Sequence, residues 1–345
     1  SDVYKRQMKR HKICKIIFAI LAVFLCVAFY ELIGICITYK KQPAVSDATI
    51  KETQNIMSVA GRENTERAVI IEKNSQALLE RVRLIQNAKD EIILSTFAFK
   101  SDESGKLILG ALHDAADRGV HVRILVDGME SWIDMEGNPY FYGLSSHENV
   151  EIKLYNKANP LKPWKTMGRM HDKYLIADGK IYILGGRNTY NYFLGDFPGH
   201  KNFDRDVLVV CDEPQKDNSV NQLWNYFETI WEQEDCRYFH NSKKLADRQS
   251  VKKAVLELQE GYQQYFEVNK EKICDTDYAD ETFETEKITL LSNPIHTQAK
   301  EPVVWYQQGE LMKNAKERVK IHTPYIICND MMYLSLIHIS EPTRP

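Results

Sequence analysis

The stretch from Met170 to Asn188, MHDKYLIADGKIYILGGRN, carries the most information in this chain. Six of its residues stand at the spacing H-x-K-x4-D-x6-G-G-x-N: His171, Lys173, Asp178, Gly185, Gly186 and Asn188. The apolar run that follows the lysine predicts a strand at 173–177, which we extend back to His171 as a hypothesis. Because His171 and Lys173 are two residues apart, a strand would project both from one face. One bound group can then contact both side chains.

These residue types suit chemistry on a phosphodiester. A phosphodiester is anionic and repels nucleophiles, so the Lys173 ammonium would neutralise that charge and stabilise the transition state. A neutral imidazole is a competent nucleophile near pH 7, which predicts a covalent phosphohistidine at His171. Asp178, in the turn Asp178-Gly179, is predicted to be a structural support. The Gly185-Gly186 pair permits close backbone approach, and the Asn188 amide is predicted to bind a phosphate oxygen.

The spacing resembles the signature of the phospholipase D superfamily, which commonly ends in G-S-x-N or G-G-x-N. This resemblance covers roughly residues 75 to 235 and implies a phosphodiesterase that needs no metal or other cofactor. In that family an acidic residue on the next strand holds the nucleophilic imidazole, and Asp206 in FDRDVLVV occupies the matching place. A surface aspartate at the start of a strand is the alternative interpretation. Family members place two such motifs across one cleft, where the second histidine protonates the leaving group.

The flanking sequence alternates between helical and strand patterns. Apolar residues at helical spacing predict one helix after Ser75 and another from Ser104 to Arg118, ended by Gly119. Strands are predicted at 91–96, 120–126, 150–155, 173–177, 180–184 and 206–210. A helix around 220–234 is predicted to bury the stripe Leu223, Trp224, Phe227 and Trp231 in the core. We therefore expect an α/β domain over 73–240, with a mixed sheet covered by helices.

The start of this domain recurs near the end of the sequence. Residues 87–96 align without gaps on 314–323 and share Asn-Ala-Lys, which predicts a second helix end, turn and strand start. Two unrelated junctions are the alternative. We expect a second phospholipase D-like domain to begin within 287–333, after a charge-rich connector at 241–286. Ile321 to Ile326 (IHTPYI) resembles the opening of the second half of bacterial cardiolipin synthases, which favours a substrate like phosphatidylglycerol.

An apolar run from Ile16 to Thr38 is long enough to cross a bilayer as a helix. A cleaved signal peptide is the rival interpretation, but no A-x-A-like cleavage site follows the run. The run is preceded by four basic residues and followed at once by two: Lys9, Arg10, Lys12 and Lys15, then Lys40 and Lys41. This bias predicts a cytoplasmic N-terminus and an extracytoplasmic catalytic domain. We therefore predict a single-pass anchor in the cell membrane over 8–41 and a polar stalk over 42–72.

Both ends of the sequence resemble translated sequencing adapter. The segments are 1–7, SDVYKRQ, and 334–345, which begins with LSLIHISEPTR. We expect the natural protein to start at Met8 and to continue beyond Tyr333. The second motif is then expected in a missing C-terminal half.

Composition narrows the remaining functions. The 345 residues carry a formal net charge of -3 at pH 7, which does not favour nucleic-acid binding by phosphate neutralisation alone. The seven cysteines show neither zinc spacing nor a disulfide framework. Two alternatives to a phospholipid enzyme stay open. One is a nuclease or other phosphodiesterase of the same superfamily, and the other is a membrane-tethered binding protein with a decayed second half. An H-x-K-x4-D motif beyond position 345 would support an enzyme, and its absence would support the binding protein.

Overall fold

The computed structural model describes residues 2–58 and 65–321, and within them the body of the protein is built on one nine-stranded mixed sheet. The strands are β1 (Arg67–Ile71), β2 (Glu91–Thr96), β3 (His121–Asp127), β4 (Val150–Tyr155), β5 (Tyr174–Ala177), β6 (Ile181–Gly185), β7 (Asp206–Val210), β8 (Cys236–Tyr238) and β9 (Phe283–Glu284). The helices are α1 (Asp2–Tyr39), α2 (Asp47–Ser58), α3 (Asn74–Asn87), α4 (Glu103–Asp117), α5 (Gly128–Asp134), α6 (Pro139–Ser145), α7 (Ser219–Trp231), α8 (Lys243–Ala246), α9 (Gln249–Ile273) and α10 (Val303–Lys313), with a 3₁₀ helix η1 (Pro163–Lys165).

The sheet has the strand order β8-β4-β3-β2-β5-β6-β7-β1-β9. β2, β3 and β4 are parallel, whereas β5, β6 and β7 form an antiparallel meander that joins β2 through β5. Strands at the centre of the sheet are apolar runs because both faces are covered. The predicted α/β architecture is confirmed, and the six predicted strands agree with the observed ones to within one residue at each end.

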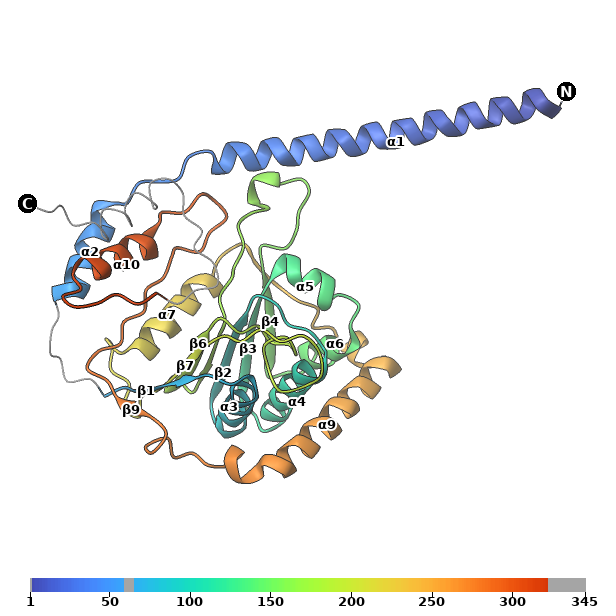
Figure 1. The fold of residues 1–345 in the computed structure, drawn as a ribbon. Coiled ribbons are helices and arrows are strands. Elements are labelled where there is room, and N and C mark those ends of the chain that lie inside the picture. The colour runs from blue at the N-terminus through green and yellow to red at the C-terminus, as the bar shows by residue number, and fades with distance from the viewer. Residues whose placement is uncertain (1, 59–64, 322–345) are drawn as a thin grey trace, which may run out of the picture.

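Helices cover the two faces of the sheet unequally. α3, α4, α6 and α9 share one apolar core with the sheet, and α7 packs against the opposite face (Figure 1). On α7, Leu223, Phe227 and Trp231 are buried, so the predicted core role of this stripe is confirmed. Trp224 is half-buried, and its indole Nε1 donates a hydrogen bond to the Glu91 carboxylate at 3.2 Å.

Within 42–72, predicted to be a stalk, the described residues 42–58 and 65–72 contain a helix and a strand. They include α2 and β1, and β1 pairs antiparallel with β7 from Arg67 opposite Val210 to Ile71 opposite Asp206. The prediction was wrong because the strand RAVII has only five residues. So short an apolar run is ambiguous by periodicity alone and is identified only by its partner strand.

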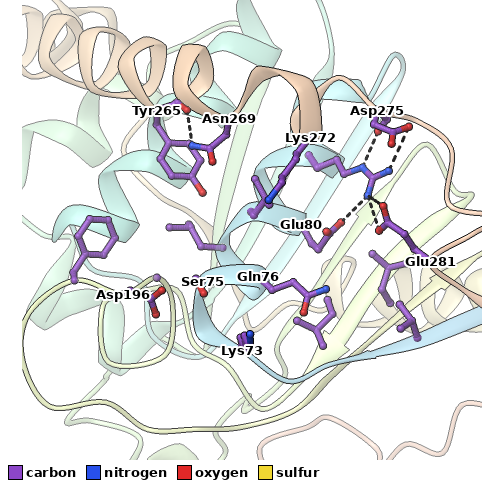
Figure 2. A pocket seen from close by; sticks show the side chains of 18 residues that line it. Lys73, Ser75, Gln76, Glu80, Asp196, Tyr265, Asn269, Lys272, Asp275 and Glu281 are labelled. Carbon is purple, nitrogen blue, oxygen red and sulfur yellow. Dashed lines mark hydrogen bonds and ion pairs between the residues drawn. The ribbon is translucent and has the colours of Figure 1, made fainter.

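The predicted connector over 241–286 also belongs to the body. Its main element is α9, which packs on α3, α4 and α6 and buries Val251, Ala254, Leu258 and Tyr262. After α9 the returning chain is held by the buried Arg83 of α3. Its Nη1 donates to the Glu281 carboxylate at 2.9 Å and its Nε to the Asp275 carbonyl at 2.7 Å (Figure 2). This segment is therefore a structural layer rather than a linker.

The predicted recurrence of 87–96 at 314–323 is observed only in part. α3 and α10 end at aligned positions to within one residue, and aligned bends follow at 89–90 and 316–317. Residues 91–96 then form β2, whereas 318–321 form no strand and leave Val319 and Ile321 exposed. Residues 322 and 323 lie outside the described residues. A strand needs a partner for its backbone groups, and β2 has β3 and β5 beside it.

Helix α1 is continuous and projects from the body (Figure 1). Its segment Met8–Tyr39 is long and apolar enough to cross a membrane. The C-terminal end of α1 contacts the body, because the Tyr30 hydroxyl donates to the Leu161 carbonyl at 3.3 Å and the Tyr39 hydroxyl to the Thr297 carbonyl at 2.8 Å. Length and composition thus agree with the predicted anchor, while its orientation stays a prediction.

Candidate active site

His171 and Lys173 line a cavity of about 380 Å³ beside the start of β5. Arg169 and residues 171–174 form one wall together with the end of β6. Leu223 and Tyr226 of α7 form a second wall, and the later segment 290–304 forms a third. The fold therefore brings a histidine and a lysine into one cavity.

The predicted strand over 171–177 was wrong at its beginning, because β5 starts at Tyr174. Residues 171–173 form an irregular segment in which Lys173 Nζ donates to the His171 carbonyl at 2.5 Å. The imidazole packs edge-on against Phe97, with ring centroids 4.6 Å apart, and Lys173 Nζ lies 5.4 Å from the same ring centroid. A shared aromatic wall, rather than strand alternation, brings the two side chains together.

Asp127, the last residue of β3, fixes the backbone that enters the site. Its buried carboxylate accepts a hydrogen bond from Met170 N at 3.1 Å and from Arg169 Nε at 2.9 Å. The same carboxylate accepts from Met129 N at 3.0 Å in the first turn of α5. Asp127 therefore ties the end of β3 to the residues immediately before His171.

The surroundings hold both groups in the ionisation states that phosphodiester chemistry needs. Burial lowers the pKa of His171, and the charges of Lys173 and Arg169 lower it further, while Asp127 opposes them. The imidazole is therefore neutral near pH 7. Burial lowers the pKa of Lys173 to about 8, although the charges of Asp172 and Asp204 raise it. Near pH 7 most of this ammonium stays charged and is able to stabilise an anion.

Asp178 lies at the far end of β5, in the turn to β6, with a φ of +51°. Its carboxylate accepts backbone hydrogen bonds from Lys89 N at 2.9 Å, Asp90 N at 2.8 Å and Glu91 N at 3.0 Å. Aspartate is one of the few non-glycine residues that tolerate this left-handed conformation. The carboxylate holds the turn before β2 and does not line the cavity.

The glycine pair makes room for two aspartates. A Cβ atom at Gly185 would collide with the Asp206 carboxylate, and one at Gly186 would collide with the Asp204 carboxylate. Gly185 lines the cavity and Gly186 does not. The glycines thus permit a close approach, as predicted, but the groups that approach them are Asp204 and Asp206. The predicted phosphate contacts of both glycines stay proposals.

Asn188 is buried and lies outside the cavity lining. Its Oδ1 accepts a hydrogen bond from Ala98 N at 3.1 Å, so the amide fixes the chain just after β2. That chain includes Phe97, the ring against which His171 packs. In this arrangement Asn188 supports the site from behind, and its predicted contact with a phosphate oxygen stays a proposal.

Asp206 does not hold the imidazole, contrary to the prediction. Its fully buried Oδ2 lies 2.9 Å from Arg81 Nη2 and 3.3 Å from Arg187 Nη1. Among the described residues no hydrogen bond joins Asp206 to His171, and its Oδ1 has no hydrogen-bond partner. The sequence correctly predicts that Asp206 stands at the start of a strand, which is β7. Its side chain turns to the two arginines because a buried carboxylate needs compensating charge.

Phe97, Asp127 and Asp172 are among the residues of the site that were not identified from the sequence. Phe97 and Asp127 stand at the ends of β2 and β3, and polar or aromatic residues at the ends of adjacent parallel strands were the signal that could have found them. Asp172 lies between His171 and Lys173, and its Oδ2 accepts from the Tyr226 hydroxyl at 2.8 Å. Burial raises the pKa of Asp172, while that hydrogen bond and the nearby lysines lower it.

A larger cavity of about 820 Å³ lies between β1, α3 and the C-terminal half of α9 (Figure 2). Its polar lining includes Lys73, Glu80 and Lys272. No histidine lines it in the part of the chain that the structure describes, and it contains none of the predicted site residues. The smaller cavity is therefore the candidate active site, because it is lined by His171, the predicted nucleophile.

His171 and Lys173 of this cavity lie in a part of the chain that is similar to known proteins. Residues 82–231 match the family model described as "Cardiolipin synthase, PLD-like domain". A protein of Helicobacter pylori described as "Uncharacterized protein" is 27% identical over 292 residues, which cover 76% of this chain and 55% of the relative. Cardiolipin synthase C of Escherichia coli is 29% identical over 154 residues, which cover 41% of this chain and 31% of the relative. The chain thus spans between about a third and about half of these curated relatives.

Among solved structures, phosphatidylserine synthase of Haemophilus influenzae aligns with a TM-score of 0.43 and 16% sequence identity. The alignment covers 64% of this chain and 48% of that chain. NucT from Helicobacter pylori aligns with a TM-score of 0.40 and 16% identity over 50% of this chain and 99% of that chain.

Proposed function

We propose that residues 82–231, which match the family model described as "Cardiolipin synthase, PLD-like domain", belong to the phospholipase D superfamily, and that this chain is a membrane-anchored phosphodiesterase or phosphatidyltransferase that acts on phospholipids. The observation that carries the proposal is a neutral, solvent-accessible His171 beside a charged Lys173 in one cavity. The apolar helix α1 and relatives named cardiolipin synthase support a substrate of the phosphatidylglycerol kind.

The proposed reaction proceeds in two steps. An imidazole nitrogen of His171 attacks phosphorus, and the bond to the leaving alkoxide breaks to give a phosphohistidine. Lys173 donates to a non-bridging oxygen and stabilises the negative charge that builds up there. Water or an alcohol then attacks the phosphohistidine, which frees the imidazole and yields phosphatidic acid or a new phosphodiester.

Protonation of the departing alkoxide requires a second group. Among the described residues, His171 is the only imidazole that lines the cavity. We propose that the acid comes from a second motif, as the family resemblance implies. A positioned general acid typically contributes about 10² to 10⁴ in rate.

The proposed function is tested with purified protein and phosphatidylglycerol labelled in its phosphate group. Denaturation at mildly alkaline pH during turnover should trap label on the peptide that contains His171, because a phosphohistidine forms there and its P–N bond is stable to base but labile to acid. A single-stranded oligonucleotide serves as the second substrate. Cleavage of the oligonucleotide without any lipid turnover would replace the phospholipid enzyme by a nuclease of the same superfamily.

The proposed orientation has its own test. A reporter fused after Lys41 should score as extracytoplasmic, because more positive charge precedes the apolar run than follows it. A matched fusion before Met8 should score as cytoplasmic. The reverse pattern would place the catalytic domain on the cytoplasmic side.

A further inference from the structure

A second lysine reaches the active-site cavity from a distant part of the chain. Lys300 lies in the segment between β9 and α10 and lines the same cavity as His171 and Lys173. Its side chain is half-buried, and its Nζ donates to the Arg169 carbonyl at 3.4 Å. That carbonyl is two residues before the proposed nucleophile, so the ammonium lies at the entrance of the reacting segment.

The segment that carries Lys300 is fixed on both sides of it. Before it, the Thr297 carbonyl accepts from the Tyr39 hydroxyl at 2.8 Å, and a Cβ atom at Gly168 would stand only 2.6 Å from Thr297 Cα. After it, the Glu301 carboxylate accepts from Ser46 N at 2.7 Å. The lysine is therefore held at the cavity by its neighbours rather than by its own charge.

The ammonium of Lys300 has hydrogen bonds left to give. It forms no ion pair in the described part of the chain, and the Arg169 carbonyl is its one hydrogen-bond acceptor there. An ammonium group has three donors, so two remain for a ligand. Asp172 is the carboxylate that raises its pKa, against the burial that lowers it.

The charges around the cavity match one phosphodiester. Arg169 is paired with Asp127, with Nη2 at 2.5 Å from Oδ1, which leaves Lys173 and Lys300 against the single carboxylate of Asp172. The site thus carries about one positive charge more than negative charge when all five groups are ionised. A phosphodiester carries one negative charge, and a partly buried anion requires such compensation.

We propose that Lys300 is a phosphate-binding residue, which together with Lys173 supplies the cations that hold the phosphodiester group beside His171. This inference deepens the proposed function and rests on it. Lys173 binds from the strand side of the cavity and Lys300 from the segment after β9. A substrate phosphate would therefore be bound by both parts of the chain at once.

The test measures anion binding without turnover. Diethyl pyrocarbonate modifies neutral imidazoles, and the rate at which His171 is modified is followed by peptide mass spectrometry at rising concentrations of inorganic phosphate. Phosphate should protect His171 in the unchanged protein. Lys300→Met keeps the aliphatic stem and should raise the half-protecting phosphate concentration about tenfold, since one charge-assisted hydrogen bond is lost. Lys300→Arg should retain most of the protection.

The control is Lys252→Met on α9, which removes the same charge from an exposed lysine paired with Asp247 and should leave protection unchanged. A parallel series uses phosphatidylglycerol in dodecyl maltoside micelles, and the same tenfold loss is expected because the phosphate group is common to both ligands. Equal protection in Lys300→Met and the unchanged protein, or no protection by phosphate in either, overturns the inference. Lys300-dependent protection without lipid turnover would leave the anion site standing and remove the proposed enzyme activity.

Discussion

The two ends of β5 bind charge in opposite ways. At the Asp178 end, one carboxylate accepts three backbone hydrogen bonds, from Lys89, Asp90 and Glu91. Its negative charge is thus stabilised by backbone N–H groups of the protein. At the other end, the one acceptor for Lys173 among the described residues is the carbonyl of His171, and burial lowers the pKa of this lysine to about 8. The first end is arranged for stability. At the second end, the Lys173 ammonium is partly desolvated by burial and is able to bind an anion.

The difference separates residues that one motif presents together. His171, Lys173 and Asp178 stand within eight positions of one another in the sequence, yet only the first two reach the cavity. Substitutions at the two ends of β5 should therefore change different measured quantities. Changes at His171 and Lys173 should affect turnover in a folded protein, and changes at Asp178 should affect folding first.

The largest effect is expected for His171→Ala. Turnover of phosphatidylglycerol should fall by about 10⁴-fold or more, and the trapped phospho-enzyme should disappear, because binding energy does not replace a missing nucleophile. The thermal unfolding midpoint should stay near that of the unchanged protein, since the imidazole is solvent-accessible. Near-normal lipid turnover by this variant would refute the phosphohistidine route.

A smaller effect, and one on stability, is expected for Asp178→Ala. Loss of the three backbone contacts and the left-handed φ together should cost about 2 to 3 kcal/mol in the free energy of unfolding. Asp178→Asn keeps one acceptor oxygen and tolerates this φ, so it should lose less. Both are followed by denaturant unfolding in detergent, with turnover normalised to folded protein. A loss of turnover without a loss of stability would make Asp178 part of the chemistry after all.

The smallest effect is the dependence of turnover on pH. The rate should fall as pH drops through the lowered pKa of His171, because the protonated imidazole is no nucleophile. It should fall again as pH rises through about 8, where Lys173 loses its proton. Each limb should approach about tenfold per pH unit.

Lys173→Arg is the control for the alkaline limb. A guanidinium stays charged throughout this range, so the limb near pH 8 should vanish even if the maximal rate is lower. Initial rates of lipid turnover from about pH 5 to about pH 10 provide the measurement. An alkaline limb that persists in Lys173→Arg would assign it to another group.

Local pattern predicted the elements well where they are long or strongly apolar. β2, β4 and β7 lie where alternation and β-branched residues placed them, and α7 buries its predicted stripe. The pattern failed at β1, whose assignment depends on a partner strand far along the chain. It also gave no sign that the segment of α9 packs against the body. It also predicted a strand from His171 onward, whereas β5 starts only at Tyr174.

The sequence by itself determined the residues on which the proposed chemistry depends: a histidine, a lysine and an aspartate at a spacing that resembles a phosphodiester-cleaving motif. It also determined an apolar segment long enough for a membrane. The tertiary structure alone decided which charges meet. Asp206 pairs with Arg81 across 125 positions, and Lys300 reaches Arg169 across 131. Residue type and periodicity are local properties of the sequence. The partner of a buried charged group is decided by packing, because every buried charge must be compensated by a group that the fold brings close to it.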